Sequence, residues 1–148
     1  MTTSFAVWRR EGFIITTDPA ATDLDAVCGF LATSYWARDV PRADLDASIR
    51  AARVYNLLEE AERRQIGFAR VVTDGVRFAW LSDVFVLDAW RGRGLARWLV
   101  ATIMADPTLC QVRRWLLATL DAHGLYRACG WAEAPAGRLM EYRPAPTR

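Results

Sequence analysis

The residues that most clearly suggest chemistry form a short turn of glycine and arginine, Arg91-Gly92-Arg93-Gly94. The two glycines let backbone N–H groups converge without obstruction from Cβ atoms, and the helix predicted after them adds a partial positive charge at its N-terminus. The two arginines add full positive charges beside those amides. A turn of this kind binds an anion, most naturally a phosphate or a pyrophosphate.

Nucleotide-binding motifs that use a glycine turn differ in their spacing. A P-loop needs Gly-Lys-Ser/Thr, which is missing here, and the dinucleotide fingerprint needs a third glycine where Arg97 stands. The pattern Arg/Gln-x-x-Gly-x-Gly/Ala fits residues 91–96, directly after a strand pattern that ends in Val84-Phe85-Val86. This stretch resembles the acetyl-CoA-binding motif of the GNAT superfamily of N-acetyltransferases. The alternative is an ordinary strand-to-helix turn with two solvated arginines.

The resemblance implies an acyl donor, acetyl-CoA, and assigns residues to it. The diphosphate would lie on the turn and the start of the helix, formed by Arg91, Gly92, Arg93, Gly94, Leu95, Ala96 and Arg97. The pantetheine and acetyl group would lie along Val84, Phe85 and Val86, whose backbone N–H groups would stabilise the oxyanion. In this family the motif strand and the next parallel strand splay apart, and the acyl-CoA enters between them.

A second stretch, Leu125-Tyr126-Arg127-Ala128-Cys129-Gly130-Trp131, is similar to the family's Leu-Tyr-x-x-x-Gly-Phe segment, whose tyrosine faces the CoA sulfur. A free thiol titrates near ~8.5 and a phenol near ~10, so a neutral Tyr126 can hydrogen-bond or protonate the departing thiolate at pH 7. The alternative is a tyrosine that packs the final helix onto the sheet. Many relatives place a CoA-binding asparagine seven residues earlier, where this chain has Thr119.

Asp83 is the candidate general base. It lies within an apolar strand, where an ionised carboxylate is costly unless it is paired or solvated by a cleft. Ser82-Asp83-Val84-Phe85-Val86 resembles the Glu-Asp-Val-Val-Val strand of the glucosamine-phosphate acetyltransferases, with serine in place of the first acid. Two alternatives stay open: Asp83 is a structural carboxylate bonded to backbone or an arginine, or a water chain removes the amine proton.

Three further residues are candidates for binding the acceptor. Tyr35 and Trp36 lie between two early helices, where relatives often bind the acceptor, and aromatic faces attract an ammonium by about 0.5–2 kcal/mol. His123 precedes Tyr126 and is expected to line the acceptor site or relay a proton. The alternatives are corner packing for the aromatic pair and a surface or capping role for the histidine. The acceptor itself, a small-molecule amine or a peptide amine, is not specified by the sequence.

The surrounding patterns predict a mixed α/β sheet with helices on both faces, the GNAT fold, over a single domain of residues 1–148. The first expected helix has apolar positions from Leu24 to Tyr35, and a second begins near Arg42. Two later helices are expected, one over Ala96–Ala105 and one from a capping Asp121 to Cys129. Either Thr22 or Asp23 is expected to cap the first helix, Asp74-Gly75 to form a hairpin turn, and Gly130 to end the last helix. The helix over Ala96–Ala105 is expected to bury one apolar stripe, formed by Leu95, Trp98, Leu99, Thr102 and Ile103. The expected strands are Phe13–Thr17, Arg53–Leu58, Gln65–Val72, Phe78–Val86, Trp115–Leu120, Trp131–Ala134 and Leu139–Tyr142.

The composition and net charge limit the class of protein and the kinds of partner that are expected. A net charge of +2 argues against nucleic acid, and no apolar run approaches the ~20 residues that cross a bilayer, so neither nucleic acid nor membrane is expected. The three cysteines are scattered and there is only one histidine, which argues against a metal site. We interpret the cysteines as buried thiols of a protein from a reducing compartment. The family resemblance implies an acetyl-CoA-dependent N-acetyltransferase, which is the leading hypothesis, and a cytoplasmic location is expected. A catalytically silent acyl-CoA-binding sensor or partner module is the alternative, and a homodimer is left open.

Overall fold

The computed structural model describes residues 4–145, and these contain one six-stranded sheet in the order β1-β2-β3-β4-β5-β6. Neighbouring strands run antiparallel except β5 and β6, which are parallel. The strands are β1 (Val7–Arg10), β2 (Phe13–Thr16), β3 (Arg53–Glu59), β4 (Arg64–Thr73), β5 (Phe78–Val86) and β6 (Arg114–Leu116).

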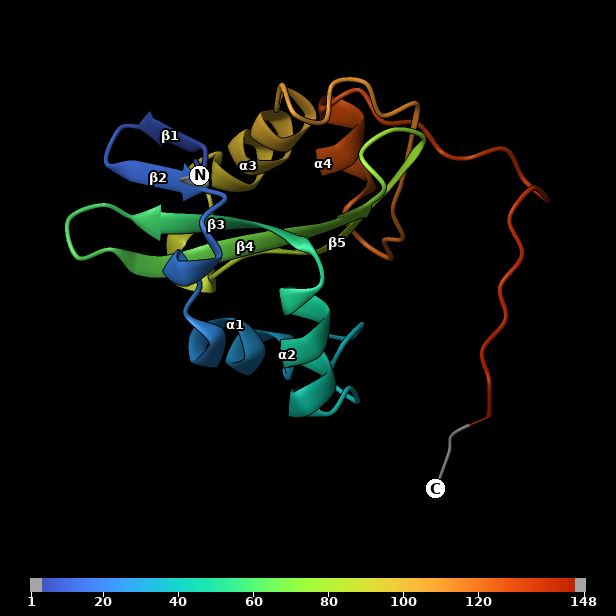
Figure 1. The fold of residues 1–148 in the computed structure, drawn as a ribbon, viewed down its shortest axis with the longest axis horizontal. Coiled ribbons are helices and arrows are strands. Elements are labelled where there is room, and N and C mark those ends of the chain that lie inside the picture. Colours follow the sequence, from blue (N-terminus) through green and yellow to red (C-terminus); the bar gives the residue numbers. More distant parts are fainter. Residues whose placement is uncertain (1–3, 146–148) are drawn as a thin grey trace.

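Helices cover both faces of the sheet (Figure 1), as the sequence predicted. One face carries α1 (Leu24–Leu31) and α2 (Arg42–Arg50), and the other carries α3 (Leu95–Met104) and α4 (His123–Ala128). Each face has its own buried apolar cluster. Within residues 4–145, no helix has the length and apolarity needed to span a membrane.

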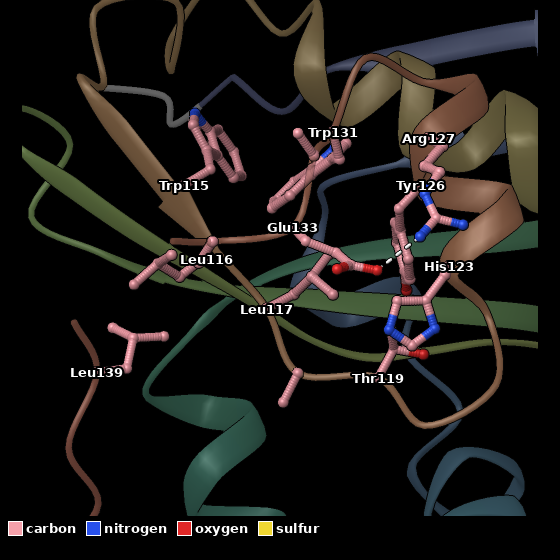
Figure 2. Close-up of a pocket in the computed structure, with 13 residues that line it drawn as sticks. Trp115, Leu116, Leu117, Thr119, His123, Tyr126, Arg127, Trp131, Glu133 and Leu139 are labelled. Carbon is pink, nitrogen blue, oxygen red and sulfur yellow. Dashed lines mark hydrogen bonds and ion pairs between the residues drawn. The ribbon is translucent and has the colours of Figure 1, made fainter. Parts of the chain in front are cut away.

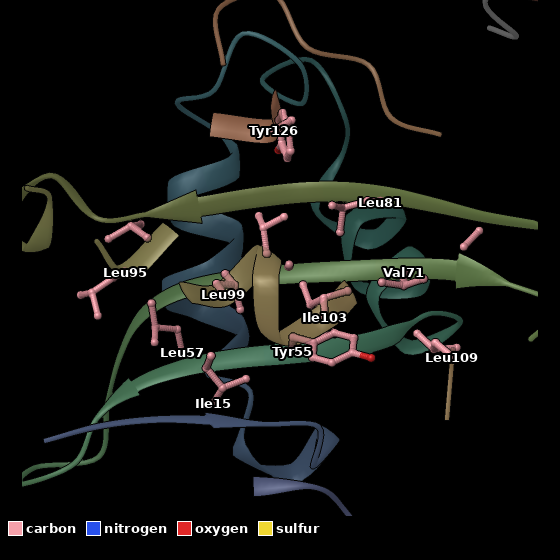
Figure 3. Close-up of a cluster of buried hydrophobic side chains, with 14 of the residues drawn as sticks. Ile15, Tyr55, Leu57, Val71, Leu81, Leu95, Leu99, Ile103, Leu109 and Tyr126 are labelled. Carbon is pink, nitrogen blue, oxygen red and sulfur yellow. The ribbon is translucent and has the colours of Figure 1, made fainter. Parts of the chain in front are cut away.

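The larger cluster lies between the sheet and α3 (Figure 3). The helical stripe expected in the sequence is its centre, because Leu95, Leu99, Thr102 and Ile103 are buried. Tyr126 of α4 joins the cluster from its edge. Packing on the same core therefore positions the start of α3 and the tyrosine of α4 relative to β5.

Several predicted boundaries are correct for local reasons. Asp23 caps α1, since its Oδ1 accepts a hydrogen bond from the amide of Ala26 at 3.0 Å. The Asp74-Gly75 turn joins β4 to β5, with Asp74 accepting from three amides and Gly75 at φ +77°. Gly130 follows α4 at φ +93°, a conformation that favours glycine.

The helix predicted to reach Tyr35 ends at Leu31. Ser34 is the physical reason: its hydroxyl donates to the Leu31 carbonyl at 2.7 Å and accepts from the Ala37 amide at 3.1 Å. These local bonds compete with the helical pattern and turn the chain. Tyr35 therefore lies on the connection to α2 and not on a helix.

The N- and C-terminal predictions also need correction. Strand β1 was not predicted, and β6 covers three residues in place of Trp115–Leu120. The segments Trp131–Ala134 and Leu139–Tyr142 are not strands, because neither pairs with another strand among residues 4–145. The chain after α4 instead extends away from the sheet as a tail without regular secondary structure (Figure 1).

Two smaller predictions are also wrong. Ala122, not Asp121, precedes α4 as its N-cap, and no side chain caps this helix. Of the three thiols, only Cys28 is buried, whereas Cys110 is exposed. Both errors have one cause: sequence type alone does not show which way a loop side chain points.

Candidate functional site

The glycine–arginine turn leads directly from β5 into α3. Gly92 and Gly94 adopt φ +81° and +73°, the left-handed conformation that residues with a Cβ seldom take. Gly94 is the N-cap of α3 and offers no capping side chain. Among residues 4–145, the amides of residues 92–97 have no hydrogen-bond acceptor. The turn therefore presents free N–H groups at a helix N-terminus, as an anion site requires.

Arginine side chains surround these amides in different ways. Arg93 lies 5.1 Å over the ring of Trp90, and Arg97 is exposed on the first turn of α3. Arg91 is turned back, since its Nε donates to the Val86 carbonyl at 3.1 Å and its Nη1 lies 2.8 Å from Asp88. Its contacts tie the turn to the end of β5.

Sequence reasoning missed a further cation at the turn, Arg10 of β1. Its guanidinium lies 5.8 Å from the ring of Trp98, and its Nη2 is 4.0 Å from the position that a Cβ on Gly94 would occupy. No local signal marks Arg10, because β1 and the turn are far apart in the sequence. Only the position of β1 beside α3 brings them together.

Strand β5 parts from its neighbour along its second half. The parallel pairing with β6 ends at Trp80 and Leu116, although β5 continues to Val86. The edge of β5 from Leu81 onward therefore has no strand beside it among residues 4–145. This opening beside Val84, Phe85 and Val86 matches the splay implied by the family resemblance. The side chain of Phe85 belongs to the α1–α2 cluster, whereas Val86 belongs to the α3 cluster.

Two cavities lie on either side of the segment after β6. The aromatic pocket, about 240 Å³, is lined by residues that include Tyr35, Trp36, Trp80, Asp83, Asp121 and Tyr126. The tail pocket, about 270 Å³, is lined by residues that include Trp115, Leu117, His123, Tyr126, Trp131 and Leu139 (Figure 2). Tyr126, Ala118 and Thr119 line both, so Tyr126 is part of the wall between them.

Tyr126 is 9% exposed as a residue, and its hydroxyl has no hydrogen-bond partner among residues 4–145. Burial is the main cause that raises the pKa of Tyr126 to about 12, and electrostatic interactions with Tyr35, Cys129 and Asp121 act in the same direction. The phenol therefore stays protonated at neutral pH. A protonated hydroxyl without a partner in a cavity wall is available to donate a hydrogen bond to a ligand.

Asp83 lies in a β-bulge, where Asp83 and Val84 together face Ala69 of β4. It adopts φ +56°, an uncommon conformation outside glycine. Asp83 is buried, and its carboxylate accepts a hydrogen bond from the indole N–H of Trp36 at 2.8 Å and pairs with the Arg70 guanidinium at 2.5 Å. The structure thus contains the arginine that the structural alternative requires, and it also places Asp83 in the pocket wall.

The three predicted acceptor residues divide between the cavities. Tyr35 and Trp36 line the aromatic pocket together with Asp83 and Tyr126, whereas His123 lines the tail pocket. Figure 2 shows His123 and Tyr126 projecting from α4 toward the segment after β6. Thr119, at the position of the family's asparagine, accepts a hydrogen bond from the Ala122 amide at 3.0 Å.

Comparison with known proteins agrees with this fold. The "Acetyltransferase (GNAT) domain" family matches residues 51–133, more than half of the chain. A protein from Xanthomonas campestris pv. campestris, described as belonging to the GNAT family, is 36% identical with a TM-score of 0.82, over 90% of this chain and 94% of that one. The chain therefore belongs to the GNAT acetyltransferase family.

Two further relatives define how far the likeness extends. A Gibberella zeae protein, for which acetyltransferase activity is inferred, is 29% identical over 138 residues, 80% of this chain and 78% of the relative. Glucosamine-6-phosphate N-acetyltransferase from Arabidopsis thaliana shares 15% identity at a TM-score of 0.62, over 89% and 99% of the two chains. At that identity the likeness concerns the fold alone.

Proposed function

We propose that this chain transfers the acetyl group of acetyl-CoA to a primary amine, by direct attack of the amine on the thioester. The observation that most strongly supports this proposal is that three features of the site lie next to one another. The free amides of residues 92–97 follow a β5 edge that has lost its strand neighbour, and the unpartnered hydroxyl of Tyr126 lies across the opening.

The turn fits the diphosphate of acetyl-CoA. Its unbonded N–H groups and glycine conformations would bind the phosphates, and Arg93, Arg97 and Arg10 would add charge. Arg91 would support the turn without bonding the phosphates directly, because its guanidinium already bonds the Val86 carbonyl and the Asp88 carboxylate. The edge of Val84–Val86 would hold the pantetheine and supply the N–H groups for the oxyanion.

Transfer forms one N–C bond and breaks one C–S bond. The amine must first lose its ammonium proton, because only the neutral amine attacks the thioester. A further N–H proton leaves once the bond between nitrogen and carbon has formed. Tyr126 would donate a hydrogen bond to the sulfur as negative charge develops there. We assign the amine proton to water in the aromatic pocket, since both oxygens of Asp83 already accept hydrogen bonds from side chains.

Calorimetry with acetyl-CoA and with acetyl-pantetheine, which lacks the diphosphate, tests the donor site. We expect acetyl-CoA to bind at least about tenfold more tightly, and the double variant R93A/R97A to lose that advantage. R38A, which removes an exposed arginine outside the turn and both pockets, is the matched control. Equal binding of the two compounds to the unmodified chain would refute the phosphate cradle.

Acetyl transfer is followed by mass spectrometry of an amine mixture. A thiol reagent is unsuitable for this assay because Cys110 is exposed and would react with it. The chain contains no lysine, so no lysine side chain of its own competes as an acceptor. Tight binding of acetyl-CoA without acetylation of any amine would favour the catalytically silent acyl-CoA-binding module over the enzyme.

A further inference from the structure

The aromatic pocket carries rings from three parts of the fold. Tyr35 and Trp36 come from the connection between α1 and α2, Trp80 comes from β5, and Tyr126 comes from α4. Tyr35 and Trp36 are 45% and 41% exposed, although large aromatic side chains gain most from burial. Adjacent exposed rings at a cavity indicate a binding surface.

These exposed rings are held in place by their polar atoms. The Tyr35 hydroxyl accepts a hydrogen bond from the Leu120 amide at 2.9 Å, and the Trp36 indole N–H donates to Asp83 at 2.8 Å. The two rings meet edge to face with centroids 5.1 Å apart. Because the polar atoms are bonded to the protein, the apolar faces are what the pocket offers to a ligand.

The charged residues that line this pocket are both acidic. Its lining includes two carboxylates, Asp83 and Asp121, and no arginine or histidine. Asp83 is neutralised by Arg70, whereas Asp121 forms no ion pair among residues 4–145. The pocket therefore carries an uncompensated negative charge and has no cation in its lining to bind an anionic group.

We propose that the aromatic pocket selects primary amines that have an apolar body and no carboxylate or phosphate. This inference rests on the proposed function, and it names the class of acceptor. Asp121 attracts the ammonium form, and the faces of Trp36 and Tyr35 bind it by cation–π attraction. The apolar body packs against the rings. A carboxylate or phosphate on the acceptor would be repelled by Asp121 and would have no cation in the lining to pair with.

A matched pair of ligands tests this selectivity. Phenylalanine amide and phenylalanine share the ring and the amine, and they differ in the negative charge. Calorimetry measures the affinity of each for the intact chain, independently of acetyl transfer. We expect the amide to bind at least about tenfold more tightly, which corresponds to one unfavourable charge contact of about 1.4 kcal/mol. Equal affinities, tighter binding of phenylalanine, or no binding of either compound would overturn the inference.

The variant D121N identifies the source of the selectivity. Loss of this charge should reduce the preference for the amide to within about threefold. The control D39N removes an almost fully exposed aspartate outside the pocket and should leave the preference unchanged. A preference that survives in D121N would overturn the role of Asp121. Selective binding without acetylation of the amide or any other amine would leave this inference standing and refute the proposed enzyme.

Discussion

Replacing Tyr126 with phenylalanine separates a chemical role from a packing role. The ring lies against the α3 core (Figure 3), and phenylalanine preserves that contact. The hydroxyl has no hydrogen-bond partner among residues 4–145, so its removal breaks no bond within them. We therefore expect the free energy of unfolding to change by less than about 0.5 kcal/mol.

Turnover should respond much more strongly than stability. A hydrogen bond to a charged group contributes about 1.5–3 kcal/mol, so loss of the bond to the leaving sulfur predicts a kcat about 10- to 150-fold lower. Full proton transfer is a smaller part of the role. With the pKa of Tyr126 at about 12 and a thiol near ~8.5, complete transfer is uphill by about 5 kcal/mol. We therefore propose that Tyr126 acts as a hydrogen-bond donor while the thiolate departs.

The assay is steady-state acetylation of one accepted amine, combined with urea unfolding of the same preparations. Y142F removes a hydroxyl from an exposed tyrosine of the tail and is the matched control, expected to leave both quantities unchanged. Because the phenol stays protonated to well above pH 10, ionisation of Tyr126 should produce no alkaline loss of kcat below that pH. A Y126F enzyme with unchanged kcat, or one whose activity falls only in proportion to lost stability, would refute the assignment.

Three other substitutions are informative. G92A should cost about 1 kcal/mol in urea unfolding and weaken acetyl-CoA in calorimetry, because φ +81° strains any Cβ although no atom obstructs it. D106N should cost about 1–3 kcal/mol near pH 7, since Tyr55 donates to this buried carboxylate at 2.6 Å. Burial raises the pKa of Asp106, but hydrogen bonds from Tyr55 and Thr108 outweigh it and lower the pKa overall, so this stabilisation is present above pH ~4 and is lost as the pH falls through the folded-state value. D83N should destabilise the chain by about 3 kcal/mol by leaving Arg70 unpaired, and should raise KM for the amine more than it lowers kcat; the opposite kinetic split would identify Asp83 as the base.

The residues that sequence reasoning placed correctly depend on local geometry. The glycines of the turn need left-handed φ values, the stripe of α3 follows one helical repeat, and the Asp74-Gly75 reversal is formed by adjacent residues. In each case the causal atoms lie within a few residues of one another. For the same reason the turn after β5 and the last helix could be predicted from the sequence together with the family resemblance.

The partners of Asp83 could not be predicted in this way. A carboxylate in an apolar strand needs a partner, but its identity depends on the bulge in β5, on Arg70 across the sheet, and on Trp36 from 47 residues away. The sequence alone left three readings open. Packing of the α1–α2 connection against β5 supplied the contact with Trp36, and pairing of β4 with β5 supplied the contact with Arg70.

The sequence by itself therefore determined a glycine–arginine turn between a buried strand and an amphipathic helix, because these features depend on backbone conformation and helical repeat. Three features were decided by the tertiary structure alone. Arg10 lies near the glycine–arginine turn, the pairing of β5 with β6 ends at Trp80, and Tyr126 forms part of the wall between two pockets. These features depend on contacts between distant segments. Such contacts are set by how the whole core packs, and no local pattern of residues encodes them.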